Sequence, residues 1–398
     1  MIGAVICELN PLHNGHAYLF RQMHKDGCKV IACMSGHFTQ RGEPAVFDKY
    51  TRTKAALLSG ADLVIELPAT YACAGAERFA FGGVYLLQAL GCVDRLYCGS
   101  ECGDTARLEQ AAQAVADTAV ENTLRHYLRE GITYAAAREK AVRRLYGEET
   151  AAVLTNPNDI LGTEYAKALH RLHSPIQLHT IQRVAVAHDS DTPDGQFASA
   201  SYLRQQLYQG QTINVYIPSS VKALFNAARQ HLSGDRNKVI ESMLLYRLRT
   251  MTPQDFAALP DISEGLENRL YEAVRSCISI DGILSYVKSK RYPLARLRRL
   301  LLYAFLQWTQ ADCEELPPYI QVLGFSRQGQ DILHEAKKSA SLPLITRHAD
   351  TACLTDEGKR FYALMCRCDD LYALTGATVL PCGVTQRTRI IFDKNIPL

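Results

Sequence analysis

Two histidines near the N-terminus have the spacing of a phosphate-binding pair. His13 and His16 flank Gly15 in the tetrapeptide His-Asn-Gly-His, which follows the apolar run 3–7 and precedes a helix-compatible stretch. Two imidazoles one helical turn apart can donate to phosphate oxygens, and the glycine lets a nucleotide lie against the backbone. The helix N-terminus adds free N–H groups and a partial positive charge. The pattern predicts a site that holds a nucleoside triphosphate with its α-phosphate open to attack.

Two later segments could complete such a site. Residues 35–44 form a polar loop with two glycines and Arg41, which suits either an anion-lined loop or a solvated surface loop. Ser199 and Ser201 would open a helix that places Arg204 one turn later, where it could neutralise β- and γ-phosphates. Alone, this second segment would be interpreted as a serine cap followed by a surface arginine. The phosphate-binding interpretation is favoured because a triphosphate held by His13 and His16 would need further groups to bind its β- and γ-phosphates.

A basic segment in the second half is a candidate RNA-binding surface. Residues 282–311 contain no acidic residue, and Tyr286, Tyr292, Tyr303 and Trp308 are interleaved with the basic ones. Helical spacing puts leucines on one face, so the arginines can project to solvent. Such a face suits RNA phosphates and unstacked bases, although a helix with a solvated basic face is the alternative. The basic candidates are Lys288, Lys290, Arg291, Arg296, Arg298 and Arg299.

The elements that must position these residues alternate between strand and helix in the first hundred residues. The predicted strands are continuous apolar runs, which is typical of a parallel sheet covered on both faces. Alternation with short loops predicts a doubly wound α/β fold. Ligands bind outside the carboxyl ends of the strands in such folds, where His13 and residues 35–45 would lie. We expect strands at 3–7, 29–34, 62–67 and 95–98, and helices at 15–25, 48–59 and 74–90, with Asp48 as N-cap.

The pattern changes along the rest of the chain. Residues 104–150 are charged and helical, which indicates an insertion. A turn at 156–159, a helix at 160–172, a strand at 176–186 and the helix that begins near Ser199 follow. Beyond residue 212 the alternation stops and strand signals are few. We therefore expect a domain boundary near 212, with a mainly helical region at 213–398.

Composition excludes several classes of protein. The 398 residues carry a net charge of +3, so any nucleic-acid binding must rest on a local patch. No apolar run reaches transmembrane length, and the N-terminus lacks a basic region followed by a cleavage site. The 13 scattered cysteines form no zinc-knuckle pattern and are interpreted as buried thiols. We expect a cytoplasmic protein with no membrane association and no metal held by protein ligands.

Several stretches together resemble the bacterial tRNA-methionine cytidine acetate ligase family, within the HxGH nucleotidyltransferase superfamily. The first is Glu-Leu-Asn-Pro-Leu-His-Asn-Gly-His at 8–16, and the similarity extends through most of the chain. Leu12, His37 and Asp159 stand where the family usually has phenylalanine, asparagine and a second asparagine. The other matching stretches are residues 34–36, 40–45, 60–68, 99–101, 157–158, 160–162, 198–200 with Arg204, 323–325 and 342–346.

The resemblance implies an activity. The family activates acetate with ATP to acetyl-adenylate, then transfers the acetyl group to N4 of the wobble cytidine of elongator tRNA(Met). It implies a Rossmann-like catalytic domain at 1–212 that binds ATP with Mg²⁺, and a tRNA-binding domain at 213–398. His13 and His16 would be catalytic. The implied ATP-binding residues are Cys7, Glu8, Asn10, Pro11, His13, Gly15, His16, Gly99, Asn158, Asp159, Arg183, Ser199 and Arg204.

Two other functions fit part of the pattern. An adenylyltransferase acting on a small phosphorylated metabolite would share the sheet, the histidine motif and the serine–arginine helix. It would not explain the helical second half or the basic segment. A non-catalytic RNA-binding protein with a degenerate nucleotide fold would not need His13, Gly15 and His16 intact.

Overall fold

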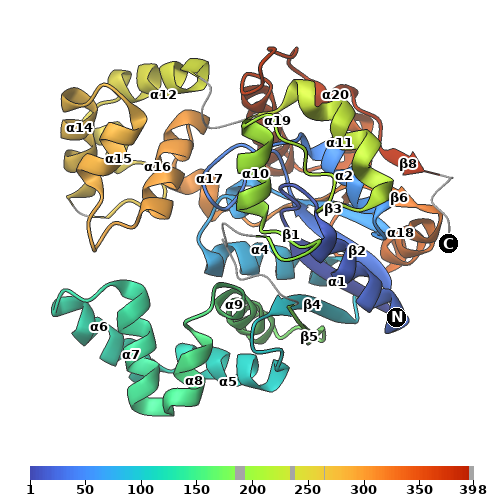
Figure 1. Cartoon of the computed structure of the whole chain (residues 1–398), viewed down its shortest axis with the longest axis horizontal. Coiled ribbons are helices and arrows are strands. Elements are labelled where there is room, and N and C mark those ends of the chain that lie inside the picture. The colour runs from blue at the N-terminus through green and yellow to red at the C-terminus, as the bar shows by residue number, and fades with distance from the viewer. Residues whose placement is uncertain (184–192, 234–237, 264, 394–398) are drawn as a thin grey trace.

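A twisted central sheet organises the molecule (Figure 1). The computed structural model describes residues 1–183, 193–233, 238–263 and 265–393. The strand order is β5-β4-β1-β2-β3-β6-β7, and β8 also pairs with β6. The strands are β1 (Ile2–Cys7), β2 (Lys29–Ser35), β3 (Leu63–Leu67), β4 (Arg95–Ser100), β5 (Gln177–Gln182), β6 (Ile320–Ser326), β7 (Leu344–Ile345) and β8 (Ile391–Asp393).

The first five strands confirm the doubly wound parallel arrangement. β1 pairs in parallel with β2 on one side and with β4 on the other. The chain therefore winds outward from β1 through β2 to β3, then returns to the opposite side of β1 to form β4 and β5. This reversal of direction creates a crevice at the carboxyl ends of β1 and β4, which is where such folds bind ligands.

Burial on both faces explains the continuous apolar strands. In β1, Ile2, Ala4 and Ile6 pack into one hydrophobic cluster, while Val5 and Cys7 pack into another on the opposite face. The first cluster is covered by α4 (Ala76–Leu90), α9 (Pro157–Arg171) and α18 (Arg327–Ser339). The second is covered by α1 (Asn14–Lys25), α2 (Lys49–Leu58), α10 (Ala200–Tyr208) and α11 (Lys222–Ala228).

The segment 213–398 is mainly helical, as expected, but it also contributes to the central sheet, which the sequence did not predict. Three strands from this segment, β6, β7 and β8, complete the sheet, and β6 runs antiparallel to β3. Without β6, the backbone N–H and C=O groups along one side of β3 would have no partner strand. Pairing with β6 satisfies them. The strand at 320–326 stands alone among helices in sequence, so the alternation of strands and helices gave no sign of it.

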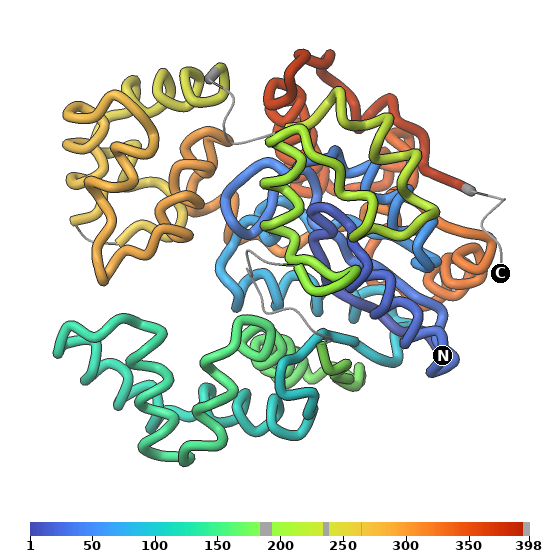
Figure 2. The backbone as a smooth tube through the Cα atoms, viewed as in Figure 1, coloured from blue at the N-terminus to red at the C-terminus, as the bar shows by residue number. Residues whose placement is uncertain are grey.

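Two helical lobes project from the same side of the sheet (Figure 2). One is the predicted insertion, and the other follows α11 in the chain. α19 (Asp356–Tyr372) packs in the same hydrophobic cluster as the second lobe. The first lobe holds α5 (Thr105–Ala116), α6 (Thr118–Arg129), α7 (Tyr134–Tyr146) and α8 (Glu148–Val153). The second holds α12 (Lys238–Thr250), α13 (Pro253–Ala257), α14 (Leu266–Ser276), α15 (Ile280–Val287), α16 (Leu294–Leu306) and α17 (Gln310–Glu314).

The remaining helices are short. α3 (Ala69–Ala72) follows β3, and α20 (Val384–Arg387) lies close to α19. In the part of the chain that is described, no helix is both long and apolar enough to cross a membrane.

Candidate functional site

A cavity of about 270 Å³ opens at the carboxyl ends of β1 and β4. Its walls come from the loop after β1, the end of β4, the start of α9, and the N-terminus of α10. Segments almost 200 residues apart in sequence are thereby brought together at one sheet edge. The predicted ATP-binding residues that line it are Cys7, Glu8, Asn10, His13, Gly15, His16, Gly99, Asn158, Arg183, Ser199 and Arg204.

The two histidines cap the N-terminus of α1 and lie against each other. The Gly15 N–H donates to His13 Nδ1 at 3.1 Å, and the His13 N–H donates to His16 Nδ1 at 3.2 Å. Their ring centroids are 3.9 Å apart. A Cβ on Gly15 would lie 2.9 Å from His13 Cε1, so the glycine leaves room for the ring as well as for a nucleotide. This arrangement fixes both rings at the cavity wall.

Both imidazoles are uncharged at neutral pH. Burial, together with the charge of Arg183, lowers the pKa of His16 to about 3. Burial, His16 and Arg183 lower the pKa of His13 well below its ordinary range. Because each Nδ1 accepts a backbone N–H, the proton of each neutral ring must lie on Nε2. Each ring is therefore neutral and keeps one N–H donor, on Nε2.

Gly99, Arg183 and Asn158 also line the cavity. Gly99 lies at the end of β4, and a Cβ there would be 3.4 Å from Arg183 Cγ. The Arg183 N–H donates to the Ser100 carbonyl oxygen at 3.0 Å. Asn158 Nδ2 donates to Glu101 Oε1 at 2.5 Å. These residues place a small number of polar groups along the cavity, as ligand-binding cavities usually do.

Arg204 has structural partners at the cavity edge. Its guanidinium donates to the Asn10 carbonyl oxygen at 2.9 Å, and a second nitrogen lies 3.3 Å from Glu43 Oε1. Ser199 caps α10 by accepting the Tyr202 N–H at 3.1 Å. Arg204 therefore links the loop after β1 to the loop after β2, besides lining the cavity as predicted.

Two predicted ATP-binding residues, Pro11 and Asp159, do not line the cavity. The Asp159 carboxylate instead accepts hydrogen bonds from the Ser100 hydroxyl at 2.5 Å and the Glu101 N–H at 2.9 Å. These donors satisfy a fully buried charge. The predicted turn at 156–159 is the first turn of α9, because Pro157 occupies the first helical position that proline favours.

The structure adds cavity residues that the motif analysis missed. Phe79, Leu161 and Tyr165 line its apolar side, and Gln40 and Arg41 line its polar side. The polar loop 35–44 was a candidate anion-binding segment, so Arg41 had a signal. The apolar residues had none, because helix periodicity does not distinguish a core position from a cavity wall.

The basic segment is only partly available to a ligand. Lys288, Lys290, Arg291 and Arg298 are exposed. The other two arginines are paired and partly buried: Arg296 Nε lies 3.4 Å and an Arg299 guanidinium nitrogen 3.9 Å from Asp261 Oδ2. Of the four aromatic residues expected to meet bases, only Tyr286 is exposed; Tyr292, Tyr303 and Trp308 are buried. Tyr303 donates to the Cys73 carbonyl oxygen at 2.8 Å instead.

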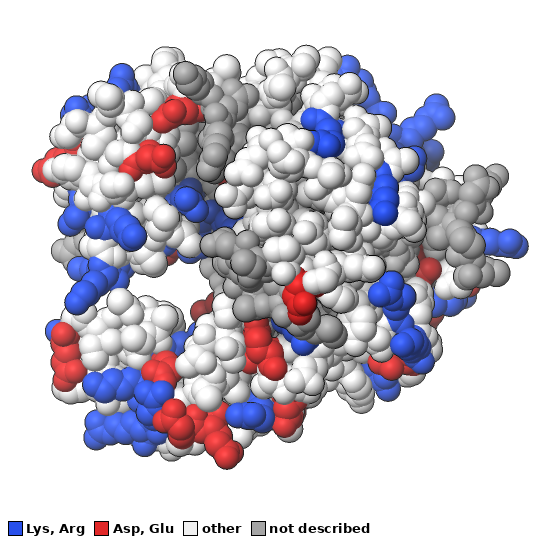
Figure 3. Space-filling model, in the orientation of Figure 1, with Lys and Arg blue, Asp and Glu red and all other residues white. Residues whose placement is uncertain are grey.

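The basic segment lies close to the loop that lines the cavity. A Cβ on Gly42 would be 2.7 Å from backbone atoms of Arg298 and Arg299, and its φ of +76° also favours glycine. The second turn of α16 therefore packs directly on the loop that carries Gln40 and Arg41. Figure 3 shows a hollow between the two helical lobes, with lysine and arginine side chains along the edge of the second lobe.

No group of three or more His, Cys, Asp or Glu side chains in the described residues could hold a metal ion. Glu8 is the one predicted site carboxylate at the cavity, and its Oε1 accepts the Gln40 N–H at 2.7 Å.

Comparisons with known proteins agree with this geometry. The family model described as HIGH Nucleotidyl Transferase matches residues 1–382. The tRNA(Met) cytidine acetate ligase of Thermoanaerobacter sp. (strain X514) is 39% identical over 354 residues, which cover 86% of this chain and 88% of that protein. The protein of the same name from Alkaliphilus metalliredigens is 36% identical over 394 residues, which cover 93% of each chain.

Solved structures extend the similarity to the whole fold. The crystal structure of apo Thermotoga maritima TmcAL has a TM-score of 0.91 and 30% identity, covering 99% of this chain and all of that one. The same protein bound with alpha-thio ATP gives a TM-score of 0.90 at 29% identity, with the same coverage. On these similarities and on the paired histidines of its nucleotide cavity, the chain belongs to the tRNA(Met) cytidine acetate ligase family of HIGH nucleotidyltransferases.

Proposed function

We propose that this protein uses ATP to activate acetate as acetyl-adenylate and transfers the acetyl group to N4 of the wobble cytidine of elongator tRNA(Met). The observation that carries the proposal is the pair of neutral, fixed imidazoles at the cavity. They supply two N–H donors at the place where a triphosphate would lie. The names of the relatives and the ATP analogue bound to the Thermotoga protein support the choice of substrates.

The first step needs positioning and charge stabilisation, and no covalent bond to the protein. An acetate oxygen attacks the α-phosphorus, the bond to the bridging oxygen breaks, and pyrophosphate leaves. His13 and His16 donate to phosphate oxygens as negative charge builds on them. Gly99, Asn158 and Arg183 hold the adenosine side. Mg²⁺ bound to the nucleotide supplies further charge neutralisation, and the tRNA substrate implies a cytoplasmic enzyme.

The second step transfers the acetyl group to RNA. The cytosine N4 amine attacks the acyl carbon of acetyl-adenylate, AMP leaves, and the amine loses a proton. The cytosine must be unstacked to reach the cavity. The exposed basic residues Lys288, Lys290, Arg291 and Arg298 can hold the anticodon-loop phosphates, because α16 packs on the loop that lines the cavity. Arg296 and Arg299 would add charge from their paired positions.

Mass spectrometry of tRNA nucleosides tests this function directly. Elongator tRNA(Met) transcript is incubated with the protein, ATP, Mg²⁺ and acetate, then digested to nucleosides. We expect N4-acetylcytidine only when all components are present, with pyrophosphate released from ATP. Reactions that lack ATP, lack acetate, or contain a tRNA without a wobble cytidine are the controls. ATP binding without pyrophosphate release would contradict the proposal and favour a non-catalytic RNA-binding protein.

A further inference from the structure

The loop of residues 37–45, after β2, forms one wall of the nucleotide cavity. Gln40 and Arg41 at its tip line the cavity. The Gln40 N–H donates to Glu8 Oε1 at 2.7 Å, which ties the tip to the end of β1. What holds the base of the 37–45 loop therefore decides where these two side chains lie relative to a bound nucleotide.

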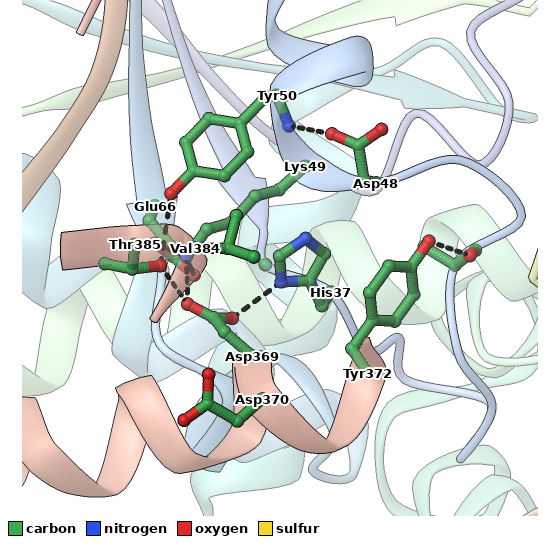
Figure 4. Close-up of polar contacts among 12 residues, drawn as sticks. His37, Asp48, Lys49, Tyr50, Glu66, Asp369, Asp370, Tyr372, Val384 and Thr385 are labelled. Carbon is green, nitrogen blue, oxygen red and sulfur yellow. Dashed lines mark hydrogen bonds and ion pairs between the residues drawn. The ribbon is translucent and has the colours of Figure 1, made fainter. Parts of the chain in front are cut away.

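The base of the loop is held by α19, from the other end of the chain (Figure 4). His37 Nδ1 lies 2.6 Å from Asp369 Oδ1. One turn further along α19, the Tyr372 ring stacks on His37 with centroids 4.1 Å apart. The Tyr372 hydroxyl donates to the Ala45 carbonyl oxygen at 2.8 Å. Two side chains one turn apart on α19 thus form hydrogen bonds with the first and last residues of the loop.

A buried lysine fixes Asp369 in turn. Lys49 Nζ lies 2.7 Å from Asp369 Oδ2 and 2.9 Å from Glu66 Oε2. The Thr385 hydroxyl also donates to Asp369 Oδ2. Glu66 packs directly under the start of the loop, since a Cβ on Gly36 would be 2.3 Å from its Oε1. The cluster joins α2, β3, α19 and α20 behind the cavity wall.

The charges of this cluster depend on each other. Burial alone would raise the pKa of Asp369, but Lys49 and His37 hold it well below its usual range, so the side chain is an anion. Lys49, Glu66 and Asp369 are all buried. Burying such a set costs desolvation energy that hydrophobic packing would not, so stability alone is a weak reason for its presence. Within the described structure, its side chains are not among those that line the nucleotide cavity.

We propose that Asp369 is a positioning residue for adenylation, which acts through His37 on the 37–45 loop and so fixes Gln40 and Arg41 against bound ATP. This proposal rests on the proposed function in assuming that ATP occupies the cavity. It also makes the C-terminal segment part of the catalytic site, although Asp369 lies more than 300 residues from His37 in sequence.

Direct ATP binding and acetate-dependent pyrophosphate release test the proposal in the full chain. Asp369→Asn keeps the shape of the side chain and leaves Lys49 paired with Glu66, and its affinity is measured well below its melting temperature so that the folded protein is compared. His37→Leu removes the contact with Asp369. We expect each to weaken ATP affinity and lower kcat at saturating ATP by about tenfold, as displaced positioning groups do. His37→Asn, whose amide can donate to Asp369, should restore both values to near wild type.

Asp62→Asn is the matched control. Asp62 is a buried carboxylate just before β3, at the amino ends of the parallel strands and away from the cavity. It also contacts the C-terminal segment. Its Oδ1 accepts the Ser326 hydroxyl at 3.0 Å and its Oδ2 accepts the Val30 N–H at 2.8 Å. This variant should lower the melting temperature but leave ATP affinity unchanged well below that temperature.

Three results would overturn the proposal. They are wild-type ATP affinity in both Asp369→Asn and His37→Leu, an equal loss of affinity in Asp62→Asn, and no rescue by His37→Asn. If His37→Leu does not fold, the ATP affinities of Asp369→Asn and His37→Asn test the proposal without it. If the wild type binds ATP but releases no pyrophosphate with acetate, the proposed function fails, and ATP affinities alone decide the role of Asp369.

Discussion

Individual side chains at the cavity show how a short motif becomes a chemical site. The backbone of α1 sets the tautomer of both histidines, because each Nδ1 accepts an N–H from its own capping turn. A neutral N–H donor can stabilise a phosphate oxygen by a hydrogen bond that strengthens as negative charge develops on that oxygen. The motif predicted these residues because their geometry is local. The partners of Arg204 could not be predicted, since Glu43 lies 161 positions away and meets it only in the folded chain.

Removing one donor should affect the first reaction alone. We expect His16→Ala to lower acetate-dependent pyrophosphate release by about 10²–10³-fold, the usual loss for one preorganised donor. Binding of tRNA, measured by filter retention, should not change. His24→Ala is the matched control, because His24 lies on the same helix, is exposed, and its ring forms a hydrogen bond with the Gly60 carbonyl oxygen, away from the cavity. Normal pyrophosphate release by His16→Ala would remove its assigned role.

The lowered pKa of His16 makes stability depend on pH in a defined direction. The pKa is about 3 in the folded protein and 6.5 ordinarily, so below pH 6.5 the unfolded chain takes up a proton that the folded chain does not. Stability is therefore lost as pH falls from 6.5, by up to about 1.4 kcal/mol per pH unit for this group. Urea unfolding at pH 7 and pH 5 should show a smaller loss for His16→Gln than for wild type. Equal losses would contradict the assigned pKa.

At the scale of elements, the 37–45 loop connects the two proposed activities. Its tip lines the nucleotide cavity, and Gly42 packs on the second turn of α16. The sequence predicted α16 and its basic residues from spacing and composition. It could not separate exposed from paired arginines, because Asp261 lies outside the acid-free segment and reaches Arg296 and Arg299 only through the packing of the lobe.

The structure therefore limits the predicted RNA-binding residues to the four basic side chains that are exposed, which are Lys288, Lys290, Arg291 and Arg298. We expect the double variant Lys290→Ala/Arg298→Ala to bind tRNA more weakly. The slope of the logarithm of its binding constant against the logarithm of salt concentration should become shallower by about 0.7–0.9 for each lost phosphate contact. Pyrophosphate release should not change. Lys337→Ala with Lys338→Ala, two exposed lysines on α18, removes the same charge elsewhere and should leave tRNA affinity intact. Unchanged tRNA affinity and salt dependence in the first variant would refute the assignment.

For the whole molecule, the sequence predicted the parallel half of the sheet but not how the sheet is completed. Continuous apolar strands that alternate with helices are a local pattern, and they predicted strands β1 to β5 and a doubly wound arrangement, although not the order of the strands. Strand β6 follows more than a hundred mainly helical residues, so its pairing with β3 depends on tertiary contacts that no local pattern contains. The same holds for Asp369, which reaches Lys49 across 320 positions.

These long-range contacts predict that residues 1–212 do not fold alone. Such a chain would lack β6 along β3 and would lose Asp369 from Lys49, leaving an open edge of a buried strand and an unbalanced buried cluster. We expect the truncated chain to aggregate or to unfold without a cooperative transition, and to bind no ATP. Co-expression with residues 213–398 should restore both properties. A soluble 1–212 chain with cooperative thermal unfolding and wild-type ATP affinity would show instead that the catalytic half needs nothing from the C-terminal segment.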